Sequence, residues 1–529
     1  MFIKLFFRFL LLSLLPWRVA AQTPFSLRLV PENIPGAPGL QSFSVGEWNG
    51  EWLLLGGRQD GLHKRQPFAA FDEASQNDRV YVINPATKQV WSAPVSSLPD
   101  AVAEQFHSTN LQFTQRDSVL YITGGYGFSP SAGDHVTHPL LTAIDLPGMA
   151  EAIRQGTSLA PFVRTLSDQR MAVTGGQMAL LEGKFYLVGG HRFDGRYNPM
   201  NHPTFIQEYT NQIRIFRIVD DGANLSIQDY HAWTDAQHLH RRDYNLAPTI
   251  FPDGRPGLTL FSGVFQYNND LPWLYPVDID TSGYMPRPEF AQYLNHYHCA
   301  HAALFDESHG VHHTLFFGGM AEYTLDTNGT LVQDINVPFV RTIARVTRYA
   351  DGSLEEIKLP VDMPALLGSG AEFRVHPDVP VYPNGVIRLN DLTGDSALLG
   401  YIFGGIESPQ PNIFFTNIPS AATPMMYQVW LSKKLAKTGE QVVRNPLRMR
   451  ISPNPATGDL QIYYWLPENA PVRVRIYLQS GRLLGEFDEG DRTEGVLWMK
   501  LAATGLPKGV LLVNLLAGKV QVTQRVALY

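Results

Sequence analysis

Short apolar segments that end in a pair of glycines recur along this chain. One example is residues 185–190, Phe-Tyr-Leu-Val-Gly-Gly, which follow a Glu-Gly turn. Similar segments stand at 52–57, 120–125, 315–319 and 401–405, and a degenerate copy, Leu-Phe-Ser-Gly, stands at 260–263. Several neighbouring segments alternate between apolar and polar residues, as half-buried β-strands do. A unit that recurs at intervals of roughly 55 to 85 residues indicates a repeat architecture built from strands.

Each unit has the parts of a four-stranded antiparallel sheet. In the first unit we expect strands at 42–45, 52–57, 79–83 and 90–91, and later units begin near residues 110, 176, 243, 299 and 370. Glycine (45), proline (38), phenylalanine (29) and tyrosine (22) are plentiful, which suits many short strands joined by turns. Six such units predict an all-β chain that forms a six-bladed β-propeller.

The sixth unit lacks a fourth strand of its own, because the sequence after residue 431 is polar and rich in lysine. Residues 25–30, Phe-Ser-Leu-Arg-Leu-Val, alternate in character and are followed by Pro31. We expect this segment to pair as the outer strand of the last sheet, since that pairing removes an open sheet edge.

The order strand, Gly-Gly, polar loop, aromatic strand and tryptophan resembles the kelch repeat over about residues 40–432. The match is best in units one, two, three and five, and the tryptophan after the third strand is clear only at Trp91 and Trp233. The resemblance implies a six-bladed kelch-type β-propeller over residues 22–432.

The N-terminus has the pattern of a secretory signal peptide at residues 1–21. Lys4 and Arg8 precede an apolar run at 9–15, and Val-Ala-Ala at 19–21 offers small residues for cleavage. The apolar run is too short to span a bilayer, and the alternative is a buried first helix. No other stretch of the sequence is apolar for long enough to predict a transmembrane segment.

The C-terminal part differs in composition from the repeats. Residues 433–450 form an expected linker, and residues 451–529 contain short strands at 461–465, 472–477, 495–499 and 509–514, which predicts a small Ig-like β-sandwich.

This C-terminal part resembles the sorting domain of the type IX secretion system of Bacteroidota. The matching features are Pro-Asn-Pro at 453–455, Ser-Gly-Arg at 480–482, Leu-Pro-Lys-Gly-Val at 506–510 and the strand 524–528. The resemblance implies the secretion machinery as a partner and a secreted, extracellular or outer-membrane surface location. The alternative is an adhesive domain that stays in the mature protein.

Composition narrows the classes of ligand. The formal net charge of −7 is spread along the chain, so a basic face for nucleic acid is not expected. Cys299 is the single cysteine, which excludes an intramolecular disulfide and a thiolate zinc site. We expect no cofactor. His-x-His pairs at 238–240 and 296–298 could hold a metal, but no carboxylate has ligand-like spacing to either pair, so no metal site is predicted.

Long loops follow the diglycines at 58–78, 126–139, 191–210, 264–274, 320–338 and 406–425, and long loops on a rigid scaffold commonly carry function. Aromatic rings stack on sugars or grip peptides, and polar neighbours fix their orientation. The alternative is that the rings pack the loops onto one another. The candidate ligand-binding residues in the loops and near the channel are His191, Arg192, Tyr197, Tyr267, Trp273, His298, His301 and Tyr323.

Charged residues at the starts of expected inner strands are the candidates for catalysis: Arg241, Asp243, Glu372 and Arg374. Kelch-type enzymes include copper oxidases, but these need a cysteine early in the propeller, and Cys299 stands in the fifth unit. They also include sialic-acid mutarotases, which need charged groups at the channel mouth. The sequence therefore predicts a secreted or cell-surface module that binds glycan or protein. The alternative is an extracellular, mutarotase- or lyase-like carbohydrate-active enzyme.

Overall fold

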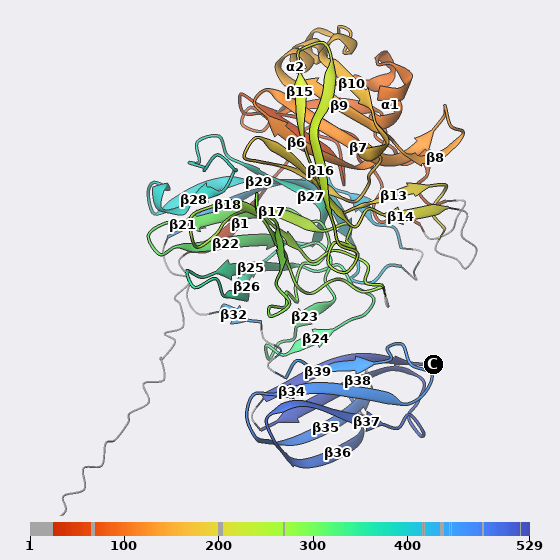
Figure 1. Ribbon diagram of the computed structural model, residues 1–529, viewed down its shortest axis with the longest axis vertical. Helices are drawn as coiled ribbons and strands as arrows, with labels where there is room; N and C mark the ends of the chain where they lie inside the picture. Colours follow the sequence, from red (N-terminus) through yellow and green to blue (C-terminus); the bar gives the residue numbers. More distant parts are fainter. Residues whose placement is uncertain are drawn as a thin grey trace, which may run out of the picture.

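The computed structural model describes residues 25–64, 69–198, 205–267, 270–414, 416, 418–433, 439–443, 445, 447–478, 481–518 and 520–529. The expected signal peptide, residues 1–21, lies outside them. The described chain is all-β apart from short helical segments, and its strands form many small antiparallel sheets (Figure 1). The helical segments are α1 (Asp100–Phe106), α2 (Leu146–Gln155) and the 3-10 turns η1 (Glu73–Ser75), η2 (Val95–Ser97), η3 (Ala160–Phe162), η4 (Gln169–Met171) and η5 (Leu389–Asp391).

Six antiparallel sheets follow one another along the described chain before the C-terminal part begins. The first three sheets are β2 (Ser44–Trp48), β3 (Glu51–Leu55), β4 (Arg79–Asn84) and β5 (Gln89–Pro94); β6 (Thr109–Arg116), β7 (Val119–Ser129), β9 (Leu140–Asp145) and β10 (Val163–Ser167), with β8 (Asp134–Thr137) on β7; and β11 (Gln177–Leu181), β12 (Lys184–Val188), β15 (Gln212–Asp220) and β16 (Leu225–Thr234). A separate hairpin, β13 (His191–Asp194) and β14 (Ile206–Tyr209), projects from the third.

The other three sheets follow the same order of strands. The fourth is β17 (Asn245–Ile250), β18 (Pro256–Phe261), β19 (Val277–Ile279) and β20 (Tyr284–Pro286). The fifth is β21 (His301–Asp306), β22 (Val311–Phe317), β25 (Thr342–Arg348) and β26 (Leu354–Asp362), extended by β28 (Ile387–Arg388) and β32 (Gln441–Val442). The sixth is β27 (Leu366–Val375), β29 (Ser396–Ser408), β31 (Met426–Ser432) and β1 (Ser26–Glu32), with β30 (Ala421–Ala422) on β29.

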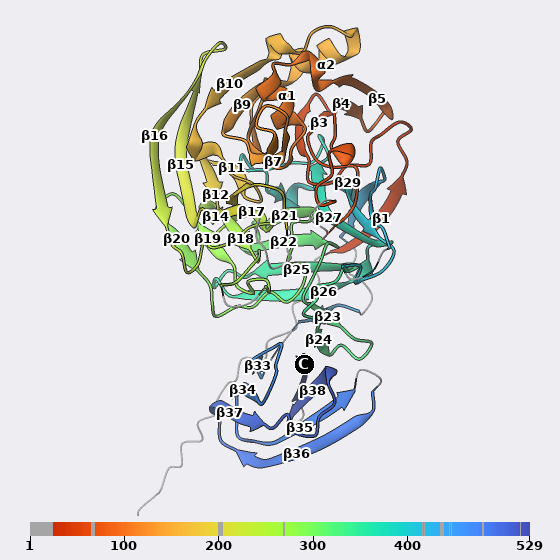
Figure 2. The ribbon, with the colours of Figure 1, turned by 90° about the vertical axis from the view of Figure 1, so that its right-hand side faces the viewer.

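The pairing expected for residues 25–30 is present. Strand β1 is antiparallel to β31 and forms the outer edge of the sixth sheet, with Leu27 opposite Leu431 and Leu29 opposite Val429. The last sheet is therefore built from both ends of this part of the chain. Figure 2 shows the sheets arranged around a common centre, with β11, β17, β21 and β27 near it and β5, β16, β20 and β1 toward the outside.

The glycine pairs link each sheet to the next one. The amide of the second glycine donates to the carbonyl of a residue that leads into the first strand of the following sheet, as Gly125 does to Val173 at 3.0 Å. The sixth sheet is linked to the first in the same way, which makes the series cyclic. The other bonds are Gly57 to Ser108 (2.9 Å), Gly190 to Arg241 (2.8 Å), Gly263 to His296 (3.3 Å), Gly319 to Leu367 (3.0 Å) and Gly405 to Leu40 (2.8 Å).

The first glycine of a pair is required by space as well as by conformation. Gly124 has φ +67°, and a Cβ there would lie 1.7 Å from the carbonyl oxygen of Val173. At Gly318 the corresponding distance to the Leu367 oxygen is 1.9 Å. Glycine permits both the left-handed backbone and the close approach of a neighbouring chain. In the degenerate fourth unit Ser262 holds the same position at φ 55°.

Apolar side chains fill the spaces between neighbouring sheets. Successive residues of a strand face opposite sides, so Tyr121 packs toward the third sheet while Leu120 and Ile122 pack toward the first. The sixth and first sheets share such a layer, in which Phe403 contacts the cluster of Trp52. These layers bury most of the large side chains of this part of the protein.

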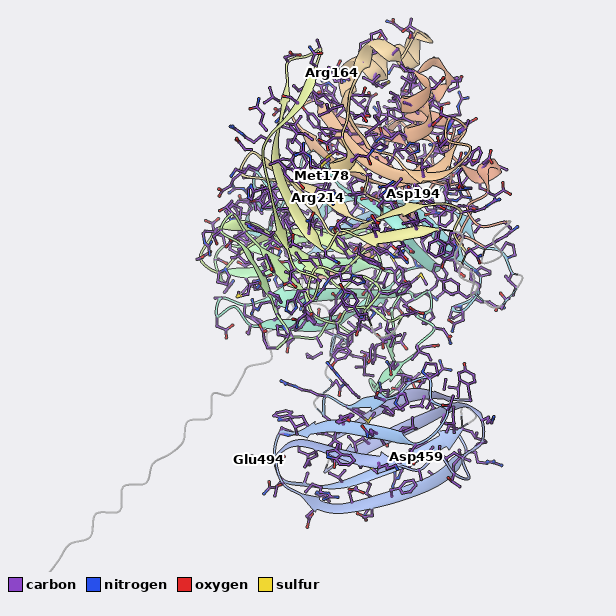
Figure 3. The ribbon with its side chains drawn as sticks, turned by 45° about the vertical axis from the view of Figure 1, so that its right-hand side comes forward. Arg164, Met178, Asp194, Arg214, Asp459 and Glu494 are labelled. Carbon is purple, nitrogen blue, oxygen red and sulfur yellow. The ribbon has the colours of Figure 1, made fainter. Side chains whose placement is uncertain are left out.

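Buried ion pairs also join neighbouring sheets. Asp278, on β19 of the fourth sheet, accepts from Arg348 of the fifth at 2.9 Å and from Arg287 at 2.9 Å. Asp278 is 5% exposed, and Thr259 donates to it as well. Arg164, which Figure 3 labels beside the long β15–β16 hairpin, donates to Asp220 at 2.6 and 2.8 Å and so joins the second sheet to the third.

The C-terminal part packs two sheets around a hydrophobic core of its own, below the other sheets in Figure 1. One sheet is β33 (Arg450–Ser452), β34 (Leu460–Leu466) and β37 (Gly495–Leu501). The other is β36 (Leu483–Arg492), β35 (Ala470–Leu478), β38 (Gly509–Ala517) and β39 (Val520–Leu528), to which β24 (Leu331–Gln333) and β23 (Tyr323–Leu325) add. Strand β36 was not anticipated from the sequence. The expected linker also differs, since its residues 441–442 form strand β32 on β26.

Candidate functional site

The first strands of all six sheets line a central cavity of about 330 Å³. Its lining runs from the start to the end of these strands, as from Asn110 to Gln115 and from Asp243 to Pro248. No residue of the long loops after the diglycines is among its lining residues. Most of the ligand-binding candidates named from the sequence are on those loops, whereas the described cavity is formed by the strands and is lined by two of the candidates, His298 and His301.

Backbone hydrogen bonds connect the starts of the first strands at one end of this cavity. We name Ser42, Asn110, Gly175, Asp243, His298 and Gly370 the strand-start ring. Each bond runs from an amide to the carbonyl of a neighbour: Ser42 to Gly370 (2.8 Å), Gly370 to His298 (2.9 Å), His298 to Asp243 (2.9 Å), Asp243 to Gly175 (2.7 Å) and Asn110 to Ser42 (3.1 Å). Between Gly175 and Asn110 the hydroxyl of Thr174 donates to the Asn110 oxygen at 3.3 Å.

His298 and Glu372 form an ion pair in the cavity. Nε2 of His298 lies 3.2 Å from Oε1 of Glu372, and the two side chains are 21% and 15% exposed. Burial lowers the pKa of His298, but the carboxylates of Glu372 and Asp243 raise it, and the net result is a pKa above the ordinary value. The imidazole therefore carries a proton over a wider pH range than a free histidine does.

Two more charged groups line the cavity, and each has a partner. Asp243 accepts from Nη1 of Arg242 at 2.6 Å, and Arg242 also donates from Nε to the hydroxyl of Tyr209 at 3.1 Å. Arg374 donates from Nη2 to Oε2 of Glu47 at 3.2 Å. The cavity thus presents an imidazole, carboxylates and a guanidinium whose orientations are held by partners.

His301 lies in the same cavity, but its pKa is shifted in the opposite direction from that of His298. Its ring nitrogens lie 3.1 Å from the Cys299 carbonyl oxygen and 3.3 Å from that of Leu246. Burial, the largest effect, lowers the pKa of His301, and the charge of His298 adds to this. Two imidazoles whose pKa values are shifted in opposite directions, His298 and His301, therefore stand in the same lining.

Arg241, a catalytic candidate of the sequence analysis, is not in the cavity. It is fully buried and donates to the carbonyl oxygens of His238, Ser262 and Tyr275 at 2.7 to 2.8 Å. Its guanidinium lies 5.0 Å from the ring of Trp273, another candidate. Burial lowers the pKa of Arg241 to about 10. These contacts assign both residues to packing of the loop that follows β18.

Three further loop candidates, His191, Arg192 and Tyr197, contact other residues of the same or neighbouring loops. Nδ1 of His191 lies 2.8 Å from the Gln207 side chain, and burial lowers the pKa of His191 well below its ordinary value. Arg192 forms a 2.6 Å ion pair with Asp194. The ring of Tyr197 lies 4.8 Å from that of His63. For these residues the structure agrees with the alternative named from the sequence, in which the rings pack the loops onto one another.

Tyr267 and Tyr323 lie elsewhere. Tyr267 is 55% exposed and stacks on His240 at 3.8 Å, and His240 stacks on Tyr209 at 3.7 Å. Tyr323 is buried edge-on against Tyr293 at 5.0 Å, next to the C-terminal part. Of the candidates named from sequence, the structure brings together Asp243, His298, His301, Glu372 and Arg374 and separates the others from them.

Side-chain amides of the first strands were missed from the sequence. Gln177 donates to the Tyr244 oxygen at 2.6 Å and accepts from the Leu246 amide at 2.9 Å. Gln115 exchanges two hydrogen bonds with the backbone of Glu47, at 2.7 and 2.8 Å. These amides fasten adjacent first strands where they line the cavity. Gln177 opens the otherwise apolar strand β11, which was the available signal, whereas Gln115 stands among other polar residues of β6.

Two further features bear on chemistry. Among the described residues, no three His, Cys, Asp or Glu side chains gather in an arrangement that could hold a metal ion. No helix of the described chain is long and apolar enough to cross a membrane.

Comparisons with known proteins add little to the geometry. No protein-family model matches the chain, and no curated protein matches it. A solved structure described as "Structure of YjhT" is similar to 76% of this chain over 99% of its own length, with 10% sequence identity and a TM-score of 0.42.

Proposed function

We propose that the six sheets are the blades of a kelch-like β-propeller. The support is the cyclic series of hydrogen bonds from the second glycines, in which the sixth sheet is bonded to the first. The outer strand β1, supplied by the N-terminal side of the chain, fits the same arrangement. Small sheets repeated around an axis need such links, because each sheet buries its faces only against its neighbours.

The propeller acts outside the cytoplasm. This proposal rests on the signal-peptide pattern of residues 1–21 and on the likeness of residues 451–529 to type IX sorting domains. Deletion of residues 450–529 should leave the protein in the periplasm while the full chain reaches the cell surface or the medium. Cell fractionation and immunoblotting measure this, and equal export of the truncated chain would exclude the sorting role.

The central cavity binds a small polar ligand, and a mono- or disaccharide fits it best. The observation that carries this proposal is the convergence of Asp243, His298, Glu372 and Arg374 in one cavity of about 330 Å³. Ligand sites are commonly cavities of roughly this size with a few oriented polar groups. A protein partner would need a surface many times larger, so glycan is favoured over protein.

A second candidate, an enzyme that acts on sugars, is favoured by the His298–Glu372 pair. Interconversion of sugar anomers needs one group that removes a proton from the anomeric hydroxyl and another that supplies one to the ring oxygen. A carboxylate and an imidazole with a raised pKa, 3.2 Å apart, can fill these roles. Kelch-type mutarotases place charged groups at the channel mouth, and the alternative named from the sequence rests on that resemblance.

A glycan array with the full chain, followed by calorimetry with the best sugar, tests binding. We expect Glu372→Gln and His298→Asn to weaken binding by about tenfold or more, since each removes a charge-assisted contact in a desolvated site. Glu494→Gln, on the exposed edge of the sandwich (Figure 3), is the matched control.

Unchanged affinity in both cavity variants would exclude the central site. For the enzyme candidate, polarimetry or saturation-transfer NMR follows anomer exchange of the bound sugar. If anomer exchange is no faster with wild type than with Glu372→Gln, the enzyme candidate is excluded and the binding function remains.

A further inference from the structure

A second, larger cavity lies where the fourth and fifth sheets meet the C-terminal sandwich. Its volume is about 560 Å³. Binding sites occur preferentially at junctions between such units. The aromatic residues among its lining are Tyr275, Phe290, Tyr293, Tyr323, Tyr349 and Trp465.

Specific contacts hold the sandwich at this junction. Strand β32 pairs with β26, and Arg345 forms an ion pair with Glu440 at 3.2 Å. On the other side, β24 pairs with β39, and Arg525 is hydrogen-bonded to Asp334. The cavity is therefore bounded by two anchored segments, which gives its walls a defined spacing.

Two arginines of the sandwich add positive charge to this cavity. Arg448 and Arg450 are both exposed, and among the residues that the structure describes neither forms an ion pair. The guanidinium of Arg448 lies 5.0 Å above the ring of Trp465.

The carboxyl groups of the cavity compensate this charge only in part. Glu356 is buried, accepts the amides of Tyr293 and Leu294, and has a pKa raised by burial to about 8, so it is largely neutral at neutral pH. Glu289 is bound to Arg287, and Glu355 accepts the hydroxyl of Tyr349.

The same sheet of the sandwich carries an exposed aromatic face beside the cavity. Arg450 is opposite Tyr463 on β34, and Tyr463 is opposite Trp498 on β37. In the next row Trp465 is opposite Val496. Trp498 is 61% exposed and Tyr463 is 40% exposed. An arginine, a tyrosine and a tryptophan thus form one row across three strands, continuous with the cavity wall at Trp465.

An aromatic face of this kind costs free energy in water unless something covers it, and contiguous exposed apolar surface commonly marks a binding site. Tyrosine and tryptophan rings stack on the apolar faces of sugar rings. Arginine pairs with carboxylate, sulfate or phosphate through two parallel hydrogen bonds. Stacking and anion pairing side by side match a polymer in which sugar rings alternate with negative groups.

We propose that this junction binds an acidic polysaccharide, with Trp465, Tyr463 and Trp498 stacking on sugar rings and Arg448 and Arg450 pairing with carboxylates. The chain of sugars runs from the cavity onto the face of β34 and β37. This site is separate from the central cavity and does not depend on the function proposed there. It requires a chain that keeps residues 451–529, as in the adhesive alternative named from the sequence.

Titration of the full chain with hexagalacturonate, followed by tryptophan fluorescence and calorimetry, tests the site. We expect saturable binding that weakens with added salt, because exposed charges are screened. Arg450→Ala and Trp498→Ala should each weaken it by about tenfold. Fully methyl-esterified hexagalacturonate, which lacks the charges, should bind much more weakly.

The matched controls are Trp48→Ala, an exposed tryptophan of β2, and Arg482→Ala, an exposed arginine of the sandwich. Both should bind as wild type does. An unchanged unfolding midpoint in Trp498→Ala separates loss of binding from loss of fold.

Three results would overturn the proposal. They are no saturable binding of hexagalacturonate, equal binding by Arg450→Ala and Trp498→Ala, or binding confined to lipopolysaccharide vesicles. Light scattering adds one more: a dimer that Trp498→Ala converts to a monomer would mean that a second copy of the chain covers the face.

Discussion

Replacement of Gly124 by alanine tests the structural role of the glycine pairs. Gly124 has φ +67°, and the new methyl carbon would lie 1.7 Å from the carbonyl oxygen of Val173. That oxygen also accepts the amide of Gly125, the bond that links the second sheet to the third. Because the obstructing atom belongs to the backbone of a neighbouring sheet, it cannot turn aside as a flexible side chain would.

The magnitude follows from three costs. An L-residue in the left-handed region costs about 1–2 kcal/mol, and overpacking a dense interior costs about 1–3 kcal/mol. If the Gly125 bond breaks, a buried donor and acceptor lose their partners, which costs about 1–3 kcal/mol. Together these give a loss of about 3–8 kcal/mol, a large part of the stability of an ordinary domain.

Urea unfolding followed by tryptophan fluorescence measures the effect, with two matched controls. Gly133 has φ +68° but nothing within 4 Å of its Cβ position, so Gly133→Ala should lose only the conformational cost of about 1–2 kcal/mol. Gly283 has open space and no positive φ, so Gly283→Ala should be neutral or slightly stabilising. Equal losses in Gly124→Ala and Gly133→Ala would refute the argument from close approach.

Three further outcomes follow from buried charges. Asp278→Asn should destabilise the protein by about 3–5 kcal/mol in urea unfolding, because it leaves the buried guanidinium of Arg348 without its counter-charge; a loss under 1 kcal/mol would contradict this. Glu356, whose pKa burial raises to about 8, binds its proton more tightly in the folded chain, so stability falls as pH rises from its ordinary pKa of 4.5 to about 8. Glu356→Gln should therefore gain stability relative to wild type as pH rises through this window, and parallel pH profiles would count against it. His298 has a raised pKa, so its pairing with Glu372 stabilises the fold fully below about pH 6.5 and is lost as pH rises through the folded value; Glu372→Gln should lower the free energy of unfolding near pH 6 by about 1 kcal/mol and lower it progressively less as pH rises, and an effect that does not change with pH would speak against the pair.

The repeat of apolar segments and glycine pairs was enough to anticipate the first three strands of most sheets and the pairing of β1. These features are local, since they depend on alternation along a strand and on glycine conformations. Strand β36 and the short strand β32 were missed for a physical reason. None of the residues of β36 is fully buried, so it lacks the alternation of a half-buried strand, and β32 is a strand only because β26 offers it an edge.

The candidate site was anticipated in part. Asp243, Glu372 and Arg374 were named because they stand at the starts of first strands, and they do line the cavity. Arg241, two residues before Asp243, was named on the same ground but turns toward Trp273. Asp243 has a left-handed backbone conformation and stands where the loop passes into the strand. The chain changes direction there, so the sequence alone does not show which side chains enter the cavity. Loop rings such as Tyr197 could not be assigned from sequence, because an aromatic residue serves packing and recognition equally well.

The charged groups of the central cavity come from three consecutive sheets. Asp243 begins the fourth, His298 leads into the fifth, and Glu372 and Arg374 belong to the sixth, whereas the strand-start ring has Ser42, Asn110 and Gly175 in the first three sheets. One side of the cavity is therefore ionic and the other neutral and polar.

This asymmetry coincides with the departure of the repeat from its own pattern. The fourth sheet is the one in which Ser262 replaces the first glycine, and its link to the next sheet, from Gly263 to His296, is the longest of the series at 3.3 Å. Sequences depart from the rules of their fold mainly where function requires it. A sugar bound in this cavity would therefore place its ionisable or reacting groups toward the fourth to sixth sheets and its neutral hydroxyls toward Asn110 and Ser42.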